Sequence, residues 1–214
     1  MTSRTADGSG RRPWVVGVSG ASGTPYARSV LNGLLDAGEP VDLVVSRAAR
    51  LTLLDETGIA FRDAHWAEDL ASWLGRESLG DVRHWPAGDL AAGPASGSYP
   101  ARGMLVVPAS TAAVAGIALG LSKDLLQRAA DVTVKERRPL VVVPRETPYT
   151  RATLVHLLAL SDAGAVVLPA SPGFYSAPKS VDQLVDFVAA KVLDAIGVPH
   201  DLITRWTGEL GGAR

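Results

Sequence analysis

The chain has 214 residues, of which 47% are hydrophobic, and this is enough for one sizeable α/β core or at most two small domains. Its net charge of −1 excludes the strongly basic surface that nucleic acid or an anionic membrane would need as a partner. It has no cysteine, and its four histidines lack the spacing of metal ligands, so we expect neither disulfides, nor a catalytic thiolate, nor a bound metal. No apolar run approaches the roughly 20 residues that cross a bilayer, and residues 1–13 lack the apolar core of a signal peptide, so we expect a soluble, cytoplasmic protein.

Short runs of β-branched residues predict parallel strands that are buried on both faces. The predicted strands are 14–18, 41–45, 104–107, 140–143 and 165–168. Helical patterns lie between them, at 24–37, 47–57, 111–136 (interrupted near 120–122), 149–162 and 180–196. Thr147 before Pro148 predicts a helix N-cap followed by proline at the first helical position. Four glycines just past helix ends predict C-caps: Gly38, Gly58, Gly164 and Gly197.

This alternation of strands and helices predicts a single doubly wound, Rossmann-like α/β domain over residues 14–198, with a mostly parallel central sheet flanked by helices. Residues 1–13 are expected to be a disordered tail, and residues 199–214 a short C-terminal tail that carries Trp206. Residues 63–100 are rich in glycine and proline, and we interpret them as a long irregular excursion between the second and third predicted strands.

Each predicted strand ends in a polar or glycine-rich segment, and open α/β sheets bind ligands outside the carboxyl ends of their strands. The first such segment contains Gly17, Gly20 and Gly23, which is neither the GxGxxG pattern nor a Walker loop. The second strand ends in Ser46-Arg47 rather than in the acidic residue that would hold a ribose, which disfavours a nicotinamide dinucleotide. A tight turn with free amides at a helix N-terminus remains, and it suits a phosphate or a flavin edge, although a structural turn without a ligand stays an alternative.

Arg128, Asp131 and Lys135 recur at helical spacing, so they share one helix face. This face could be a solvated one, but Arg145-Glu146 follows the fourth predicted strand at its ligand-binding end. We therefore predict that these cations converge to hold a phosphate leaving group. The loop 169–175 either caps the sheet or covers an apolar substrate with the hydroxyl of Tyr175.

A series of short motifs, in order across residues 14–206, resembles the UbiX/Pad-type flavin prenyltransferases. The motifs are Gly-Ala-Ser-Gly (20–23), Ser-Arg-Ala-Ala (46–49), Glu56-Thr57, Ala-Ser-Gly-Ser (95–98), Arg-Ala-Ala-Asp-Val (128–132), Lys-Glu-Arg-Arg-Pro-Leu-Val (135–141), Pro-Arg-Glu-Thr-Pro (144–148), Gly-Ala-Val (164–166) and Pro-Gly-Phe-Tyr (172–175). The most specific part is Lys-Glu-Arg-Arg-Pro-Leu followed by Pro-Arg-Glu-Thr-Pro. The wider superfamily of flavin-binding cysteine decarboxylases shares the fold and the glycine loop but not this pair.

The resemblance implies transfer of the dimethylallyl group of dimethylallyl phosphate to reduced FMN, at N5 and then at C6, without a metal. It also implies that the prenylated FMN serves a UbiD-type decarboxylase, and that the chain forms a dodecamer with pockets at subunit interfaces. The implied FMN contacts are Gly20, Ala21, Ser22, Ser46, Ser110, Thr111, Ala112, Ala113 and Arg145. The implied prenyl-phosphate contacts are Tyr175 and Lys191, and the implied catalytic residues are Ser22, Glu56, Arg128, Lys135 and Glu146.

The sequence departs from the family pattern after the third predicted strand, where Ala112 and Ala113 leave only backbone contacts to a flavin, and at Lys123-Asp124. Two other functions remain as alternatives. A flavin-dependent decarboxylase of the cysteine or phosphopantothenoylcysteine type is disfavoured because the chain has no cysteine and no histidine before His65. A non-catalytic flavin carrier is the second. The resemblance leaves open whether the donor is the monophosphate or the diphosphate.

Overall fold

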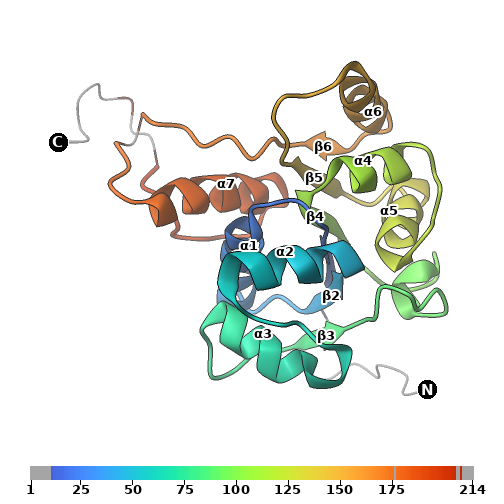
Figure 1. Ribbon diagram of the computed structural model, residues 1–214, viewed down its shortest axis with the longest axis horizontal. Coiled ribbons are helices and arrows are strands. Elements are labelled where there is room, and N and C mark those ends of the chain that lie inside the picture. Colours follow the sequence, from blue (N-terminus) through green and yellow to red (C-terminus); the bar gives the residue numbers. More distant parts are fainter. Residues whose placement is uncertain (1–10, 176, 206–207, 209–214) are drawn as a thin grey trace.

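The computed structural model describes residues 11–175, 177–205 and 208, so Trp206, most of the predicted N-terminal tail and half of the predicted C-terminal tail lie outside the described residues. The described chain forms one six-stranded parallel sheet in the order β3-β2-β1-β4-β5-β6 (Figure 1). The strands are β1 (Trp14–Val18), β2 (Val41–Val45), β3 (Val82–His84), β4 (Gly103–Ala109), β5 (Leu140–Pro144) and β6 (Val166–Val167). The predicted doubly wound α/β fold is confirmed.

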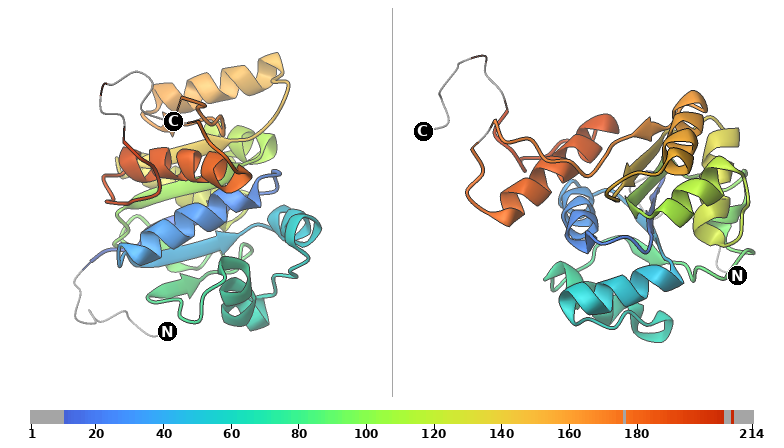
Figure 2. Two further views of the ribbon diagram at one scale, coloured as in Figure 1. Left: turned by 90° about the vertical axis from the view of Figure 1, so that its left-hand side faces the viewer. Right: turned by 45° about the horizontal axis from the view of Figure 1, so that its top comes forward.

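Helices cover both faces of the sheet. They are α1 (Thr24–Asp36), α2 (Arg47–Thr57), α3 (Trp66–Leu74), α4 (Thr111–Ala118), α5 (Leu125–Lys135), α6 (Arg151–Asp162) and α7 (Val181–Ala195), with short 3₁₀ turns η1 (Asp63–His65) and η2 (Gly93–Ala95). Figure 2 shows α1 and α7 on one side of the sheet and α4, α5 and α6 on the other. Among the described residues, no helix has the length and apolar character needed to span a bilayer.

Successive side chains of each strand point to opposite faces of the sheet, so the strands contribute to two hydrophobic cores, one on each face. Val16 and Val18 of β1 pack with α1, α3 and α7, whereas Val15 faces the cluster built from α4, α5 and η2. All three valines are buried, as expected for a central strand whose successive side chains point to opposite faces. The predicted strands at 14–18 and 41–45 match the observed ones, and the other three differ only at their ends.

The start of α6 differs from the prediction. Thr147-Pro148, expected as its N-cap and first residue, lies in the preceding loop, and the peptide bond between them is cis. The N-cap is Thr150, whose hydroxyl oxygen accepts a hydrogen bond from the Thr153 amide at 3.2 Å. Threonine has the same capping chemistry at both positions, so composition alone does not choose between them.

The excursion at 63–100 contains α3 and β3, which the sequence did not predict, and it is fixed to the sheet by one buried carboxylate. Asp42, in β2, accepts hydrogen bonds from the Trp85 indole at 3.0 Å and from the Tyr99 hydroxyl at 2.6 Å. Because a buried carboxylate needs such partners, these bonds hold the segment around η2 against the sheet. The η2 segment then lies beside α5, where the Arg128 side chain donates to the Ala95 carbonyl at 3.1 Å.

Candidate functional site

The strand order places the topological switch point between β1 and β4, because the chain leaves β1 toward β2 and returns to β4 on the other side. The loops that follow these two strands are hydrogen-bonded to each other. The Ser19 hydroxyl donates to the Pro108 carbonyl at 2.8 Å and accepts from the Ser110 amide at 2.7 Å. The Ser19 hydroxyl therefore ties the ends of β1 and β4 together at the carboxyl edge of the sheet.

Two helices begin at this edge with serine caps. Ser46 accepts from the Ala49 amide at 3.1 Å at the start of α2, and Ser110 accepts from the Ala113 amide at 3.2 Å at the start of α4. The positive ends of both helix dipoles therefore lie at the predicted ligand site, where they favour an anionic group such as a phosphate. The predicted contact Ala113 already gives its amide to Ser110, which leaves Thr111 and the exposed Ala112 to face a ligand.

The glycine loop packs tightly on α2. A Cβ atom at Gly20 would lie 2.4 Å from the Cβ of Ala48, so only glycine lets the loop approach the first turn of α2 this closely. Gly23 has a φ of 113°, a left-handed conformation that favours glycine, and it is the N-cap position of α1 without a side chain to cap it.

Glu56, on α2, supplies the missing cap of α1. Its carboxylate accepts from the amides of Gly23 and Thr24, both at 2.8 Å, and from the Thr24 hydroxyl at 2.6 Å. The expectation of free amides at this turn is therefore wrong for Gly23 and Thr24, and the N-termini of α2 and α4 are the better places for a phosphate.

These contacts also set the charge of Glu56. Burial raises the pKa of the Glu56 carboxyl, but hydrogen bonds from Thr24, Ser22 and the two backbone amides outweigh it, so that the pKa lies below its ordinary value. Glu56 is ionised at neutral pH and holds Ser22, whose hydroxyl is one of its donors. Ser22 and Glu56, both predicted to be catalytic, thus lie in direct contact.

Arg145 fixes the same loop from the other side. It follows β5 and donates from Nε to the Ser22 carbonyl at 2.9 Å. Burial raises the pKa values of the Tyr26 and Tyr149 hydroxyls above their ordinary value. The positive charge of Arg145 opposes this rise by a smaller amount. The sequence did not single out these two tyrosines, although Tyr26 lies only three residues after Gly23. The neighbouring Glu146 is exposed and accepts from the amide of Thr147 at 2.9 Å.

Arg128 and Lys135 lie on α5, away from Arg145. Arg128 pairs with Asp131 at 2.8 Å, which confirms the predicted common helix face, and Lys135 pairs with Glu136. Helix α5 ends just before the amino end of β5, whereas Arg145 follows the carboxyl end of that strand. Five residues at about 3.3 Å each separate the two ends by roughly 16 Å. The expectation that Lys135 lies beside Arg145 therefore does not hold within one chain.

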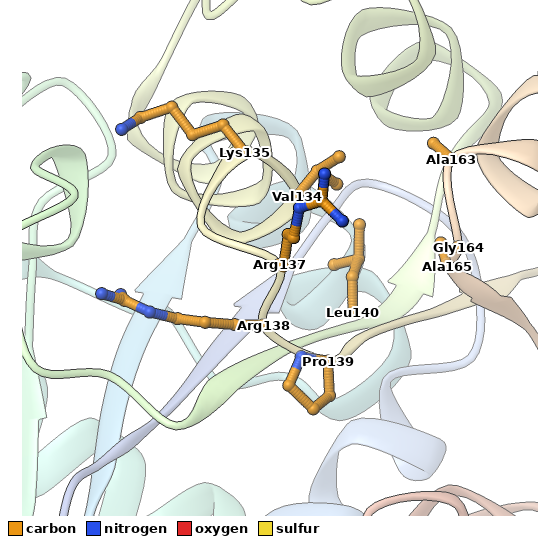
Figure 3. A pocket seen from close by; sticks show the side chains of 9 residues that line it. All are labelled: Val134, Lys135, Arg137, Arg138, Pro139, Leu140, Ala163, Gly164 and Ala165. Carbon is orange, nitrogen blue, oxygen red and sulfur yellow. The ribbon is translucent and has the colours of Figure 1, made fainter.

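A cavity of about 620 Å³ opens at this amino edge of the sheet (Figure 3). Figure 3 shows Arg137 and Leu140 between the end of α5 and Ala163–Ala165, while Lys135 and Arg138 point away from those alanines. The Arg138 guanidinium donates to the Gly97 carbonyl at 2.7 Å. This cavity is thus distinct from the crevice at the carboxyl edge.

Tyr175 and Lys191 each lie near Phe187 of α7. The Tyr175 ring packs edge-on against Phe187, with ring centroids 5.6 Å apart, and Lys191 lies one helical turn beyond Phe187. The loop that carries Tyr175 leaves the sheet beside Arg145, since the Ala170 amide donates to the Pro144 carbonyl at 3.1 Å. The two predicted prenyl-phosphate residues therefore share one side of α7.

The chemistry of this edge fits FMN. Two helix N-termini with serine caps and a guanidinium suit the phosphate of the flavin, and backbone groups of the glycine loop border the same crevice. Among the described residues, no group of three or more histidine, aspartate or glutamate side chains could hold a metal ion.

Comparisons with known proteins agree with this arrangement. The family model described as Flavoprotein matches residues 2–193. The chain is 68% identical over 212 residues to a flavin prenyltransferase UbiX of Streptomyces coelicolor, with 94% of this chain and 98% of the relative covered.

Two solved structures share the fold closely. The crystal structure of AnUbiX (PadA1) in complex with FMN and dimethylallyl pyrophosphate has a TM-score of 0.82 at 34% identity, covering 93% of this chain and 99% of that one. A dodecameric FMN-dependent UbiX-like decarboxylase from Escherichia coli O157:H7 also has a TM-score of 0.82, at 38% identity, covering 92% and 100%.

Proposed function

The chain belongs to the UbiX flavin prenyltransferases within the flavoprotein family, and we propose that it transfers the dimethylallyl group of dimethylallyl phosphate to reduced FMN, first at N5 and then at C6. One observation of the structure carries this proposal: the glycine loop is held from two sides, by Glu56 and by Arg145, at the switch point of the sheet. A rigid loop of this kind suits a flavin whose reacting edge must keep its position during group transfer.

We propose that the FMN phosphate binds at the N-termini of α2 and α4, near Ser46 and Ser110. The remaining contacts would come from Gly20, Ala21, Ser22, Thr111, Ala112 and Arg145. Ala113 lies in the same turn, but its amide is already hydrogen-bonded to Ser110. When bound, reduced FMN supplies the nucleophilic N5 and C6 atoms. Ionised Glu56 orients the Ser22 hydroxyl toward that edge.

In the first transfer the allylic C–O bond of the donor breaks, a C–N bond forms at N5, and the phosphate leaves with the electron pair of the broken bond. Cationic side chains would stabilise this departing charge, and we propose Lys191 and the Tyr175 hydroxyl for this role, since Tyr175 packs on Phe187, one helical turn before Lys191. In the second step the prenyl double bond would take up a proton at one carbon, the other carbon would form the C–C bond to C6, and C6 would lose its proton. Ionised Glu56, which accepts a hydrogen bond from the Ser22 hydroxyl, is a group that could hold or pass on such protons.

We further propose that Arg128, Lys135 and Glu146 complete the phosphate pocket across a subunit boundary. A single chain keeps Lys135 about one strand length from Arg145, so a second copy must supply one of them if both act in one site. The dodecameric neighbour from E. coli supports such an assembly. Exposed leucines on α2 and α6 are consistent with buried faces in an oligomer: Leu51, Leu54, Leu154 and Leu158. A UbiD-type decarboxylase would receive the product.

The test is anaerobic incubation of the protein with dithionite-reduced FMN, dimethylallyl phosphate and EDTA, followed by mass analysis of the flavin. We expect flavin that has gained one dimethylallyl unit, no product from oxidised FMN, and no need for Mg²⁺, because fixed cations do the work of a metal. A parallel arm with the diphosphate identifies the preferred donor. Carbon dioxide released from a cysteine-containing substrate would instead indicate a decarboxylase, and unchanged flavin would indicate a carrier.

A further inference from the structure

Asp194 lies at the centre of a charged cluster that joins the end of α7 to the C-terminal segment. Arg205 donates to both of its oxygens, at 2.9 Å to Oδ1 and 3.4 Å to Oδ2, and His200 Nε2 lies 3.2 Å from Oδ1. Lys191, one turn earlier on α7, approaches Oδ2 only to 3.7 Å. Asp194 therefore has three cationic or donor neighbours, and Lys191 is the most loosely held of them.

The C-terminal segment is built to hold this geometry. Val198 is buried, and its amide donates to the Leu193 carbonyl at 3.0 Å, which turns the chain sharply after α7. The His200 side chain is 2% exposed, and its Nδ1 accepts from the Leu202 amide at 3.3 Å. With Nδ1 acting as acceptor, the Nε2 atom of the neutral ring carries the proton and donates to Asp194.

The contacts of Asp194 with Arg205 and His200 affect whether Lys191 can bind the donor phosphate. A lysine that pairs tightly with a carboxylate is a poor ligand for a phosphate, because the pair must break before the phosphate binds. Arg205 offers a two-pronged contact, which suits a carboxylate better than the ammonium group of lysine does. While Arg205 occupies Asp194, the Lys191 ammonium remains half-exposed and available.

We propose that Arg205 and His200 are positioning residues for the prenyl-phosphate subsite: Arg205 neutralises the charge of Asp194, His200 donates a hydrogen bond to the same carboxylate, and together they keep Lys191 available to the phosphate of the donor. This inference rests on the proposed function, in which Lys191 contacts that phosphate. Neither residue touches the donor. Both act through the carboxylate that they share with Lys191, so the segment 198–205 sets the donor affinity.

The central variant is Arg205→Ala, and Arg205→Gln repeats it with less loss of packing. Without Arg205, Asp194 should capture Lys191 and raise the KM for dimethylallyl phosphate by about threefold to tenfold, with a smaller change in kcat. Arg205→Lys should raise the KM less than Arg205→Ala does, because it keeps the charge but loses the two-pronged contact. The decisive variant is the double change Asp194→Asn with Arg205→Ala, which removes the competing carboxylate and should restore the KM.

Two controls separate this proposal from a general loss of structure. Arg76→Ala breaks a comparable pair, in which Nη1 lies 2.7 Å from Asp36, and it should leave the KM unchanged. FMN affinity and oligomer mass, measured for every variant, should equal those of the wild type.

Any one of the following outcomes overturns the inference. An unchanged KM in Arg205→Ala and Arg205→Gln refutes it, as does a raised KM that Asp194→Asn does not reverse, since the segment would then act only as packing. A Lys191→Ala variant with unaltered donor affinity refutes it as well. If the wild-type protein makes no prenylated flavin, the proposed function fails and the inference fails with it, whereas wild-type transfer with an insensitive Arg205 removes the inference alone.

Discussion

Replacing Glu56 by glutamine tests whether this carboxylate, rather than the glycine loop alone, holds the flavin edge of the site. The carboxylate accepts from two backbone amides and from the Thr24 hydroxyl, and its two oxygens share these donors. A glutamine side chain offers one acceptor oxygen, and its amide nitrogen would face a donor. At least one backbone N–H at the start of α1 therefore loses its partner.

The expected loss of stability follows from this count. Removing a helix N-cap costs about 1 kcal/mol. Each hydrogen bond to a charged group contributes roughly 1.5–3 kcal/mol, and for an exposed carboxylate the contribution lies at the lower end of this range. We therefore expect Glu56→Gln to lower the stability by about 1–3 kcal/mol, which is a fall of roughly 3–10 °C in Tm for a chain of this size. Because the Ser22 hydroxyl loses its orientation, the prenyl-transfer rate should fall by about 10- to 100-fold.

The assay combines thermal unfolding at fixed protein concentration with single-turnover transfer to reduced FMN. Asp55→Asn is the matched control, because it removes the same charge from the preceding, exposed position of α2. The stability difference between wild type and Glu56→Gln should also depend on pH. The pKa of Glu56 is lowered in the folded chain, so its contribution is full above the ordinary value of 4.5 and is lost as pH falls through the lower folded pKa.

A Glu56→Gln variant with wild-type Tm and wild-type transfer rate would show that the loop keeps its shape without the carboxylate. Equal losses in Glu56→Gln and Asp55→Asn would mean that net charge on α2, rather than the cap of α1, is responsible. Either result would refute the reasoning from hydrogen bonds.

Two further predictions concern α5 and β3. Lys135→Ala should leave FMN affinity unchanged and slow transfer by about 30- to 1,000-fold in the assembled protein. This is the effect expected from losing one contact to a leaving phosphate that is worth about 2–4 kcal/mol. An unchanged single-turnover rate would remove Lys135 from the site. Burial lowers the pKa of the His84 imidazole to about 4. The Asp63 carboxylate opposes this shift, and the Arg50 guanidinium adds to it. The unfolded chain therefore binds more protons than the folded chain between about pH 4 and 6.5, and stability should fall by about 3 kcal/mol as pH decreases through this window. His84→Gln should flatten that decline. His65→Gln, at an exposed position, should not. Parallel Tm-versus-pH curves for wild type and His84→Gln would contradict this.

The parts of the fold that the sequence predicted are those in which local pattern and burial coincide. Strand β3 lacks the run of buried valines that marks β1: its three residues, Val82–His84, pair only at the edge of the sheet and are partly exposed at the first two positions. Helix α3 is nine residues long, within a segment full of glycine and proline, and its amphipathic pattern is too short to stand out. Of the four predicted glycine C-caps, Gly58 is the C-cap of α2. Gly38, Gly164 and Gly197 each lie one residue after the C-cap of their helix, and all four glycines have the positive φ that ends a helix.

The candidate site was predicted in its parts but not in its connections. The polar ends of β1, β4 and β5 do meet at one edge, as parallel strands require. The contact between Glu56 and the start of α1 spans 32 residues to Thr24, and no local pattern reveals it. Lys135 was misplaced for the opposite reason: it is close to Arg145 in sequence, but a buried strand lies between them, and an extended strand carries its two flanking residues to opposite edges of the sheet.

The hydroxyl of Ser19 has a consequence for anyone who recombines this enzyme with its relatives. It serves the carbonyl of Pro108 and the amide of Ser110 at once, across 89 and 91 residues of sequence. A glycine loop transplanted alone, with alanine at position 19, would leave both backbone groups without this partner. The smallest exchangeable module of the crevice is therefore a pair of loops, and a chimera should take both loops from the same parent.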